Sequence, residues 1–138
     1  MVRPDVVGRK LARASAWLDE AGDLIGRSEG WQTDAHARDL ASFYLFLTIQ
    51  ECIDLAAHWV ADAGWPVPDD AGAIFDLLAD RLEIDSDLAE RMRGAVGLRN
   101  RIAHGYSSLD HDRIRAEFSE GGATLRQFLA IVADAAGL

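Results

Sequence analysis

The sequence has a single cysteine and lacks any hydrophobic run long enough for a lipid bilayer. Because Cys52 stands alone, the chain cannot form an internal disulfide bond. The first ten residues, MVRPDVVGRK, contain no apolar signal region. The longest apolar-rich run lies between Asp39 and Glu51 and spans ten residues, whereas a membrane helix needs about 20. We therefore expect no membrane association, and a reducing cytoplasm is the simplest compartment.

β-branched residues are also sparse, and they rarely alternate with polar residues, so the sequence offers little support for strands. Alanine, leucine and arginine are abundant instead, and all three favour helices. The 138 residues are 49% hydrophobic and 27% charged, which is ordinary for a folded domain with a buried core. No internal repeat or low-complexity tract divides the chain, and we expect one domain over residues 1–138.

Apolar spacing and capping residues predict five helices. They cover about 4–27, 34–63, 70–81, 86–103 and 110 to the C-terminus. The expected N-caps include Thr33 or Asp34, Asp85 or Ser86, and Asp110. The pair Gly121–Gly122 predicts a kink or a short break in the last helix. The expected fold is an all-α antiparallel helical bundle.

The second predicted helix is apolar on two sides in its first half. One stripe comprises Leu45, Ile49, Cys52, Ile53, Ala56, Trp59 and Val60. The opposite line begins with Leu40, Phe43 and Leu47 and continues with Glu51, Asp54 and His58. This pattern predicts a central helix that touches several neighbours. It also places Cys52 on the core face, where we expect no nucleophilic role.

The charge of the chain is strongly acidic but uneven. A formal net charge of −9 should make the whole molecule repel nucleic acid and anionic lipid. Residues 91–115, however, hold six arginines against two aspartates, a local charge of +4 that leaves −13 for the remainder. This basic segment is compatible with a local phosphate contact. The alternative is a set of solvated helix faces whose arginines pair with nearby acids.

The basic segment contains the stretch LRNRIAHGYSSLD (98–110), which combines arginines, an asparagine, a histidine and a tyrosine. Arginine presents a planar fork that suits phosphate oxygens, and histidine exchanges a proton near neutral pH. Together they suffice for RNA cleavage without metal, because a base takes the 2′-hydroxyl proton, the oxygen attacks the adjacent phosphorus, and a cation stabilises the developing charge. No histidine or cysteine cluster has metal-ligand spacing and no glycine-rich phosphate loop is present, so we expect neither a metal nor a cofactor.

The spacing of these groups raises a geometric difficulty. Asn100 and His104 are four residues apart and share a helix face. Arg99 and His104 are five apart, which separates them by roughly 140° around an ideal helix. One helix therefore aims them poorly at a single phosphate. A kink near Gly105 or a second copy of the helix would bring them together, and we favour a site built from two chains.

The segment Arg99 to His104 resembles the R-x-x-x-x-H signature of the HEPN superfamily, and Tyr106 extends it to the R-x-x-x-x-H-x-Y form of HepT-like proteins. Residues 50–60 and 97–114 are also similar to the second-helix segment and the fourth-helix end of that family. The likeness covers about residues 30–137.

This resemblance implies a function and a set of site residues. Arg99 and His104 would be the catalytic pair of an endoribonuclease toxin, with Asn100 in support, and the substrate would be RNA such as tRNA or mRNA. Tyr106 would be the tyrosine to which a cognate nucleotidyltransferase antitoxin adds AMP, which silences the toxin. The family implies a homodimer with the two motifs facing each other. We expect Glu51 and Asp54 to be structural partners of the motif arginines.

Each residue also has a structural interpretation. Arg99 would pair with Glu51 or Asp54, His104 would be a helix C-terminal residue favoured by the dipole, and Tyr106 would anchor the loop. Two other functions remain open at this point. One is a non-catalytic helical dimer that binds nucleotide or substrate for a partner nucleotidyltransferase. The other is a dimeric adaptor whose motif is a structural relic.

Overall fold

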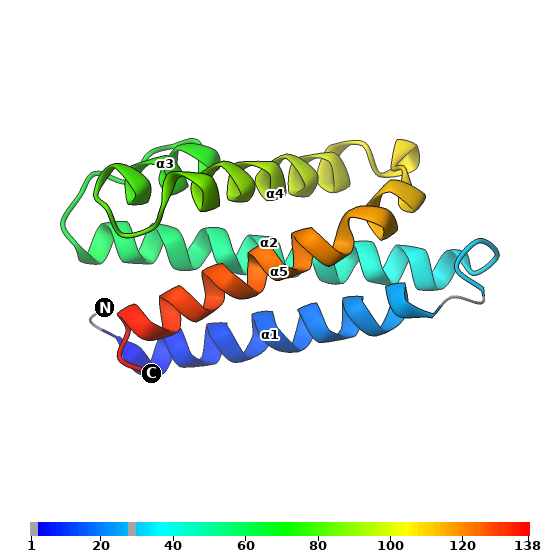
Figure 1. Ribbon diagram of the computed structural model, residues 1–138, viewed down its shortest axis with the longest axis horizontal. Coiled ribbons are helices and arrows are strands. Elements are labelled where there is room, and N and C mark those ends of the chain that lie inside the picture. Colours follow the sequence, from blue (N-terminus) through cyan, green and yellow to red (C-terminus); the bar gives the residue numbers. More distant parts are fainter. Residues whose placement is uncertain (1–2, 28–29) are drawn as a thin grey trace.

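The computed structural model describes residues 3–27 and 30–138, apart from the side chain of Tyr106, and shows an antiparallel helical bundle (Figure 1). The described residues contain helices and no strand, so the predicted all-α fold is confirmed. Each long helix starts within one residue of its predicted position. The elements are α1 (Pro4–Gly26), α2 (Ala35–Asp62), α3 (Ala71–Asp80), α4 (Ser86–His104), the short 3-10 helix η1 (Tyr106–Ser108) and α5 (His111–Ala135).

Aspartate caps explain why four of the helices begin where they do. The carboxylates of Asp34, Asp70, Asp85 and Asp110 each accept a hydrogen bond from the backbone N–H three residues later, at 2.7–3.2 Å. Each cap satisfies a donor that the helix itself leaves free and contributes about 0.5–2 kcal/mol. The structure thus selects Asp34 over Thr33 and Asp85 over Ser86.

Helix α2 is the central element and contacts the four other long helices. All seven residues of its predicted core stripe are buried. The second apolar line differs, because Leu40 and Phe43 remain 42% and 52% exposed in the single chain. Among the described residues, α2 alone has the length and hydropathy of a membrane span. More than half of that segment is buried inside the bundle, as befits a core helix.

Helix α5 crosses the bundle from the end of α4 to the N-terminal end of α1, which brings the C-terminus near the start of α1 (Figure 1). It continues without interruption through Gly121–Gly122, so the break predicted there is wrong. Gly122 is buried, and the ring of Phe118 lies 3.3 Å from the position that a Cβ would take. The glycine therefore admits a close aromatic contact without disturbing the helix.

Candidate active site

The motif occupies the last turn of α4 and the sharp turn that follows it. The buried side of this turn carries Ile102, Arg99 is half-buried, and Asn100 and His104 are exposed. Gly105 ends the helix, and its N–H donates to the carbonyl of Arg101 at 2.8 Å. Backbone and packing thus fix the directions in which the motif side chains leave the helix.

The guanidinium group of Arg99 faces α2. Its Nη1 donates to Oε1 of Gln50 at 2.9 Å, and Nε2 of Gln50 in turn donates to Oδ1 of Asp54 at 3.2 Å. Asp54 therefore reaches Arg99 through Gln50, and the ion pair considered from the sequence is not formed. The Nε atom of Arg99 is buried without a hydrogen-bond partner in the described structure. An unsatisfied buried donor costs about 1–3 kcal/mol, so the hydrogen bonding of the Arg99 guanidinium within the chain is incomplete.

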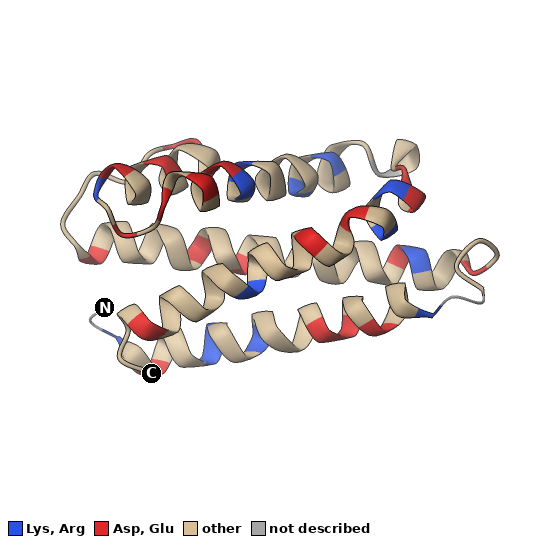
Figure 2. Cartoon of the chain, viewed as in Figure 1, with Lys and Arg blue, Asp and Glu red and all other residues tan. Residues whose placement is uncertain are grey.

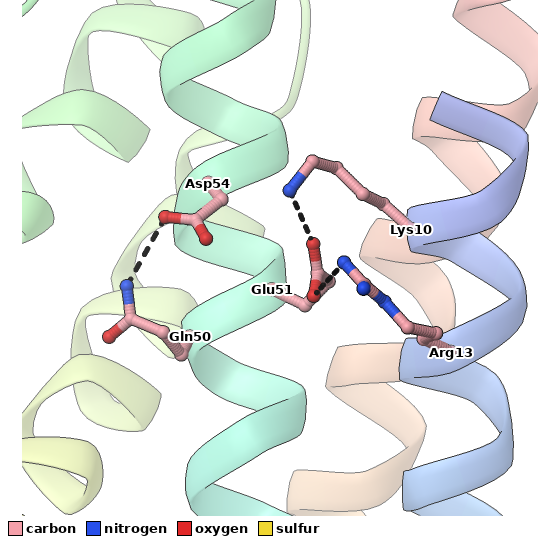
Figure 3. A network of polar contacts seen from close by, with 5 residues as sticks. All are labelled: Lys10, Arg13, Gln50, Glu51 and Asp54. Atoms are coloured by element: carbon pink, nitrogen blue, oxygen red, sulfur yellow. Dashed lines mark hydrogen bonds and ion pairs between the residues drawn. The ribbon is translucent and has the colours of Figure 1, made fainter. Parts of the chain in front are cut away.

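Glu51 is not a partner of the motif arginines, and the prediction that it would be one is wrong. Its side chain is buried, Oε1 accepts from Nζ of Lys10 at 2.8 Å, and Oε2 accepts from Nη2 of Arg13 at 3.2 Å. Figure 3 shows Glu51 directed toward α1, whereas Gln50 and Asp54 lie on the other side of α2. Consecutive helix positions diverge by about 100°, which directs neighbours into different contacts.

His104 lies apart from Arg99. It is exposed in the final turn of α4, where a positive imidazole interacts favourably with the helix dipole. In the part of the chain that the structure describes, no hydrogen bond or ion pair joins the two motif residues. Both residues belong to the continuous helix α4, so the divergence of about 140° expected for an ideal helix applies to them. The backbone of Tyr106 begins η1, but its side chain lies outside the described part, so its predicted role stays a prediction.

The basic segment is only partly neutralised by acids. Among its six arginines, Arg93 pairs with Asp76 and Arg113 pairs with Glu117. The others differ: Arg91 and Arg99 donate to amide oxygens, Arg115 lies over the ring of Trp31, and Arg101 is exposed. Figure 2 shows basic residues on the second half of α4 and the start of α5, whereas acidic residues gather around α3 and the start of α4. Within residues 3–27 and 30–138, ion pairs thus account for two of the six arginines.

A groove of about 620 Å³ lies beside the motif, between α4 and α5, and it was not predicted from the sequence. Leu45 and Ile49 of α2 contribute to its lining. Arg101 and Gly105 also line the groove, but Arg99 and His104 do not. The assignment of the site therefore rests on the motif residues rather than on the size of the hollow.

The remaining sequence-predicted residues take structural positions. Burial, with a smaller contribution from the Glu51 charge, raises the pKa of the Cys52 thiol to about 12, which leaves it neutral and unreactive. His36 is exposed and His58 is half-buried on α2. Gln50 is the contact that residue-by-residue reasoning missed. Its only sequence signal is its position one turn before Asp54.

Comparisons with known proteins place the chain by sequence and by fold. The Ribonuclease HepT-like family matches residues 14–132. A protein of Archaeoglobus fulgidus, named provisionally as an RNase, is 34% identical over 93 residues, which are 67% of this chain and 70% of that protein. The mRNA nuclease HepT of Shewanella oneidensis is 23% identical over 93% of this chain and 96% of its own length.

Two solved structures have the same fold. One is a tri-AMPylated Shewanella oneidensis HEPN toxin in complex with an MNT antitoxin; it has a TM-score of 0.88 and 23% identity, and the match covers 94% of this chain and 98% of that chain. The other is a toxin-antitoxin structure with AMP-PNP; it has a TM-score of 0.86 and 23% identity over 93% of this chain and 98% of that chain. Since the family match spans most of the bundle, including the motif on α4, the chain belongs to the Ribonuclease HepT-like family.

Proposed function

We propose that this protein is a metal-independent endoribonuclease and the toxin of a toxin-antitoxin pair. The observation that carries the proposal is the contact of Arg99, a motif arginine that is held by a neutral amide rather than by a carboxylate. His104 follows five residues later with its imidazole exposed to an incoming substrate. In the proposed reaction, imidazole assists the attack of the 2′-hydroxyl on the adjacent phosphorus, and the guanidinium stabilises the charge that develops on the phosphate oxygens.

The active form is proposed to be a homodimer, because one chain aims the two groups apart. The exposed apolar residues Leu40 and Phe43 share a face of α2 with Gln50 and Asp54, given the helical repeat. A second copy that covers this apolar line would place its own α4 beside Arg99. One phosphodiester would then contact the arginine of one chain and the histidine of the other.

Control of the toxin is proposed to depend on Tyr106 and a nucleotidyltransferase antitoxin, in the cytoplasm. The support comes from position: Tyr106 follows the motif by two residues and opens η1 directly after Gly105. The related Shewanella oneidensis toxin is described as tri-AMPylated and bound to its antitoxin. AMP at this tyrosine would bring negative charge to the basic segment and exclude RNA.

A second candidate is a non-catalytic dimer that binds nucleotide or substrate for the nucleotidyltransferase. The separation of Arg99 from His104 within one chain and the overall charge of −9 favour it. The two candidates differ in one outcome, because only the toxin hypothesis requires the chain itself to cut RNA.

The decisive test is incubation of purified protein with total RNA and tRNA in excess EDTA. We expect the wild type to cleave RNA and both His104→Ala and Arg99→Ala to lose at least about 100-fold in rate. His36→Ala, which removes an exposed histidine from α2, and Arg126→Ala, which removes a surface arginine from α5, are the matched controls and should retain activity. Equal cleavage by the wild type and His104→Ala, or cleavage by neither, would refute the nuclease proposal. Cleavage that appears only after a metal ion is added would refute metal independence.

A further inference from the structure

We propose that Gln50 is a positioning residue for Arg99, and that its side-chain amide holds the guanidinium while leaving its charge available to substrate. This inference rests on the proposed nuclease function and identifies a residue that the R-x-x-x-x-H-x-Y motif does not contain. Gln50 lies on α2, 49 positions before Arg99, and is half-buried.

Two partners of opposite kind fix the orientation of the Gln50 amide. Arg99 has only donors to offer, and an ionised Asp54 has only acceptors. The carbonyl of Gln50 must therefore face Arg99, at 2.9 Å, and its NH₂ group must face Asp54, at 3.2 Å. The opposite orientation would set donor against donor and acceptor against acceptor. Asp54 thus acts on Arg99 by aligning the amide between them.

A neutral acceptor has a specific advantage at this position. A carboxylate in direct contact would compensate the guanidinium charge, and a phosphate would then have to displace it. An amide oxygen supplies one hydrogen bond and leaves the unit charge for the transition state. Only Nη1 of Arg99 is engaged by Gln50, so the outer edge of the planar fork keeps its donors.

The carboxylate that follows Gln50 in the sequence is held elsewhere. Glu51 follows Gln50 directly, but its two oxygens are taken by Lys10 and Arg13 of α1 and its side chain is buried (Figure 3). This network keeps the Glu51 carboxylate away from the motif arginine. The chain thus places a neutral residue toward α4 and an acidic residue toward α1, one position apart.

The first experiment replaces the amide by its isosteric carboxylate. Gln50→Glu should lower kcat for cleavage of a mixed-sequence oligoribonucleotide by about 100-fold with a smaller change in KM, because it neutralises the cation that acts in the transition state. Gln127→Glu is the matched control, since Gln127 of α5 accepts from Nη2 of Arg91 at 3.2 Å. Arg91 lies on α4, as Arg99 does, and the change in net charge is identical. Gln127→Glu should retain wild-type kcat. Equal effects of the two substitutions, or wild-type kcat in Gln50→Glu, would overturn the proposal.

A second experiment tests the positioning without reference to RNA. In ¹⁵N-labelled protein, the Arg99 guanidinium should show slow rotation of its Nη groups in the wild type and fast rotation in Gln50→Leu, which removes both hydrogen bonds. Helical content by circular dichroism confirms that the variant is folded. Unchanged Arg99 signals in Gln50→Leu would refute the role of Gln50, whether or not the chain cleaves RNA. If Gln50→Leu loses the slow rotation but the wild type cleaves no RNA, the role of Gln50 stands and the nuclease proposal is wrong.

Discussion

The most demanding prediction concerns the division of the site between two chains. On an ideal helix, Arg99 and His104 lie about 9 Å apart at their Cα atoms and diverge by about 140°. Arg99 is further drawn toward α2 by its bond to Gln50, while His104 points into solvent. Hydrogen-bond contact with one phosphate requires both groups within about 3 Å of it. We therefore predict that the arginine and the histidine of one site come from different chains of the dimer.

Mixing two inactive variants measures this directly. When Arg99→Ala and His104→Ala chains are co-refolded in equal amounts, half of the dimers are mixed, and each mixed dimer has one site with both residues intact. Activity should recover to about a quarter of the wild type. If each chain held a complete site, the mixture would stay as inactive as its parents.

The converse mixture is a control for which the two models predict different residual activities. A chain that carries both substitutions is mixed in equal amounts with the wild type. If each site is shared between two chains, about a quarter of the wild-type activity should remain; if each site lies within one chain, about half should remain. Native mass spectrometry establishes that mixed dimers have formed. Absence of recovery in the first mixture and half activity in the second, with mixed dimers present, would refute the two-chain site.

We expect three further outcomes, two from the described contacts and one from the position of Tyr106 after the motif. The pKa of the Cys52 thiol is raised to about 12 in the folded chain, against about 8.5 in an unfolded one, so only the unfolded state loses this proton at alkaline pH. The free energy of unfolding should therefore fall by about 1.4 kcal/mol per pH unit above pH 9. In urea titrations, Cys52→Ala should lack this component of the pH dependence. Glu51→Ala should destabilise the bundle by about 2 kcal/mol, measured as a lower Tm, because Lys10 and Arg13 lose their buried acceptor. As a control, Arg9→Ala should change stability by less than about 0.5 kcal/mol, since the ion pair of Arg9 with Asp5 is exposed. Incubation with the cognate nucleotidyltransferase and ATP should increase the mass of the chain by one or more AMP units, and a shift that persists in Tyr106→Phe would place the modification elsewhere.

Local chemistry made much of the fold predictable. Helix starts followed from aspartates such as Asp34 and Asp110, because an N-cap depends on a carboxylate and an N–H only three residues away. The core stripe of α2 followed from the helical period alone. The Gly121–Gly122 break failed for the opposite reason, since Gly122 serves the packing of Phe118 rather than the local backbone.

The sequence by itself determined on which part of α4 the motif residues lie, because motif spacing and helical rotation are properties of neighbouring residues. Only the tertiary structure decided their partners. Whether Gln50 or Glu51 meets Arg99 depends on where α1 and α4 pack around α2, and helical periodicity contains no information about those crossings. For the same reason the exposed Leu40–Phe43 line and the groove between α4 and α5 emerged only with the assembled bundle, in which side chains far apart in sequence compete for the same space.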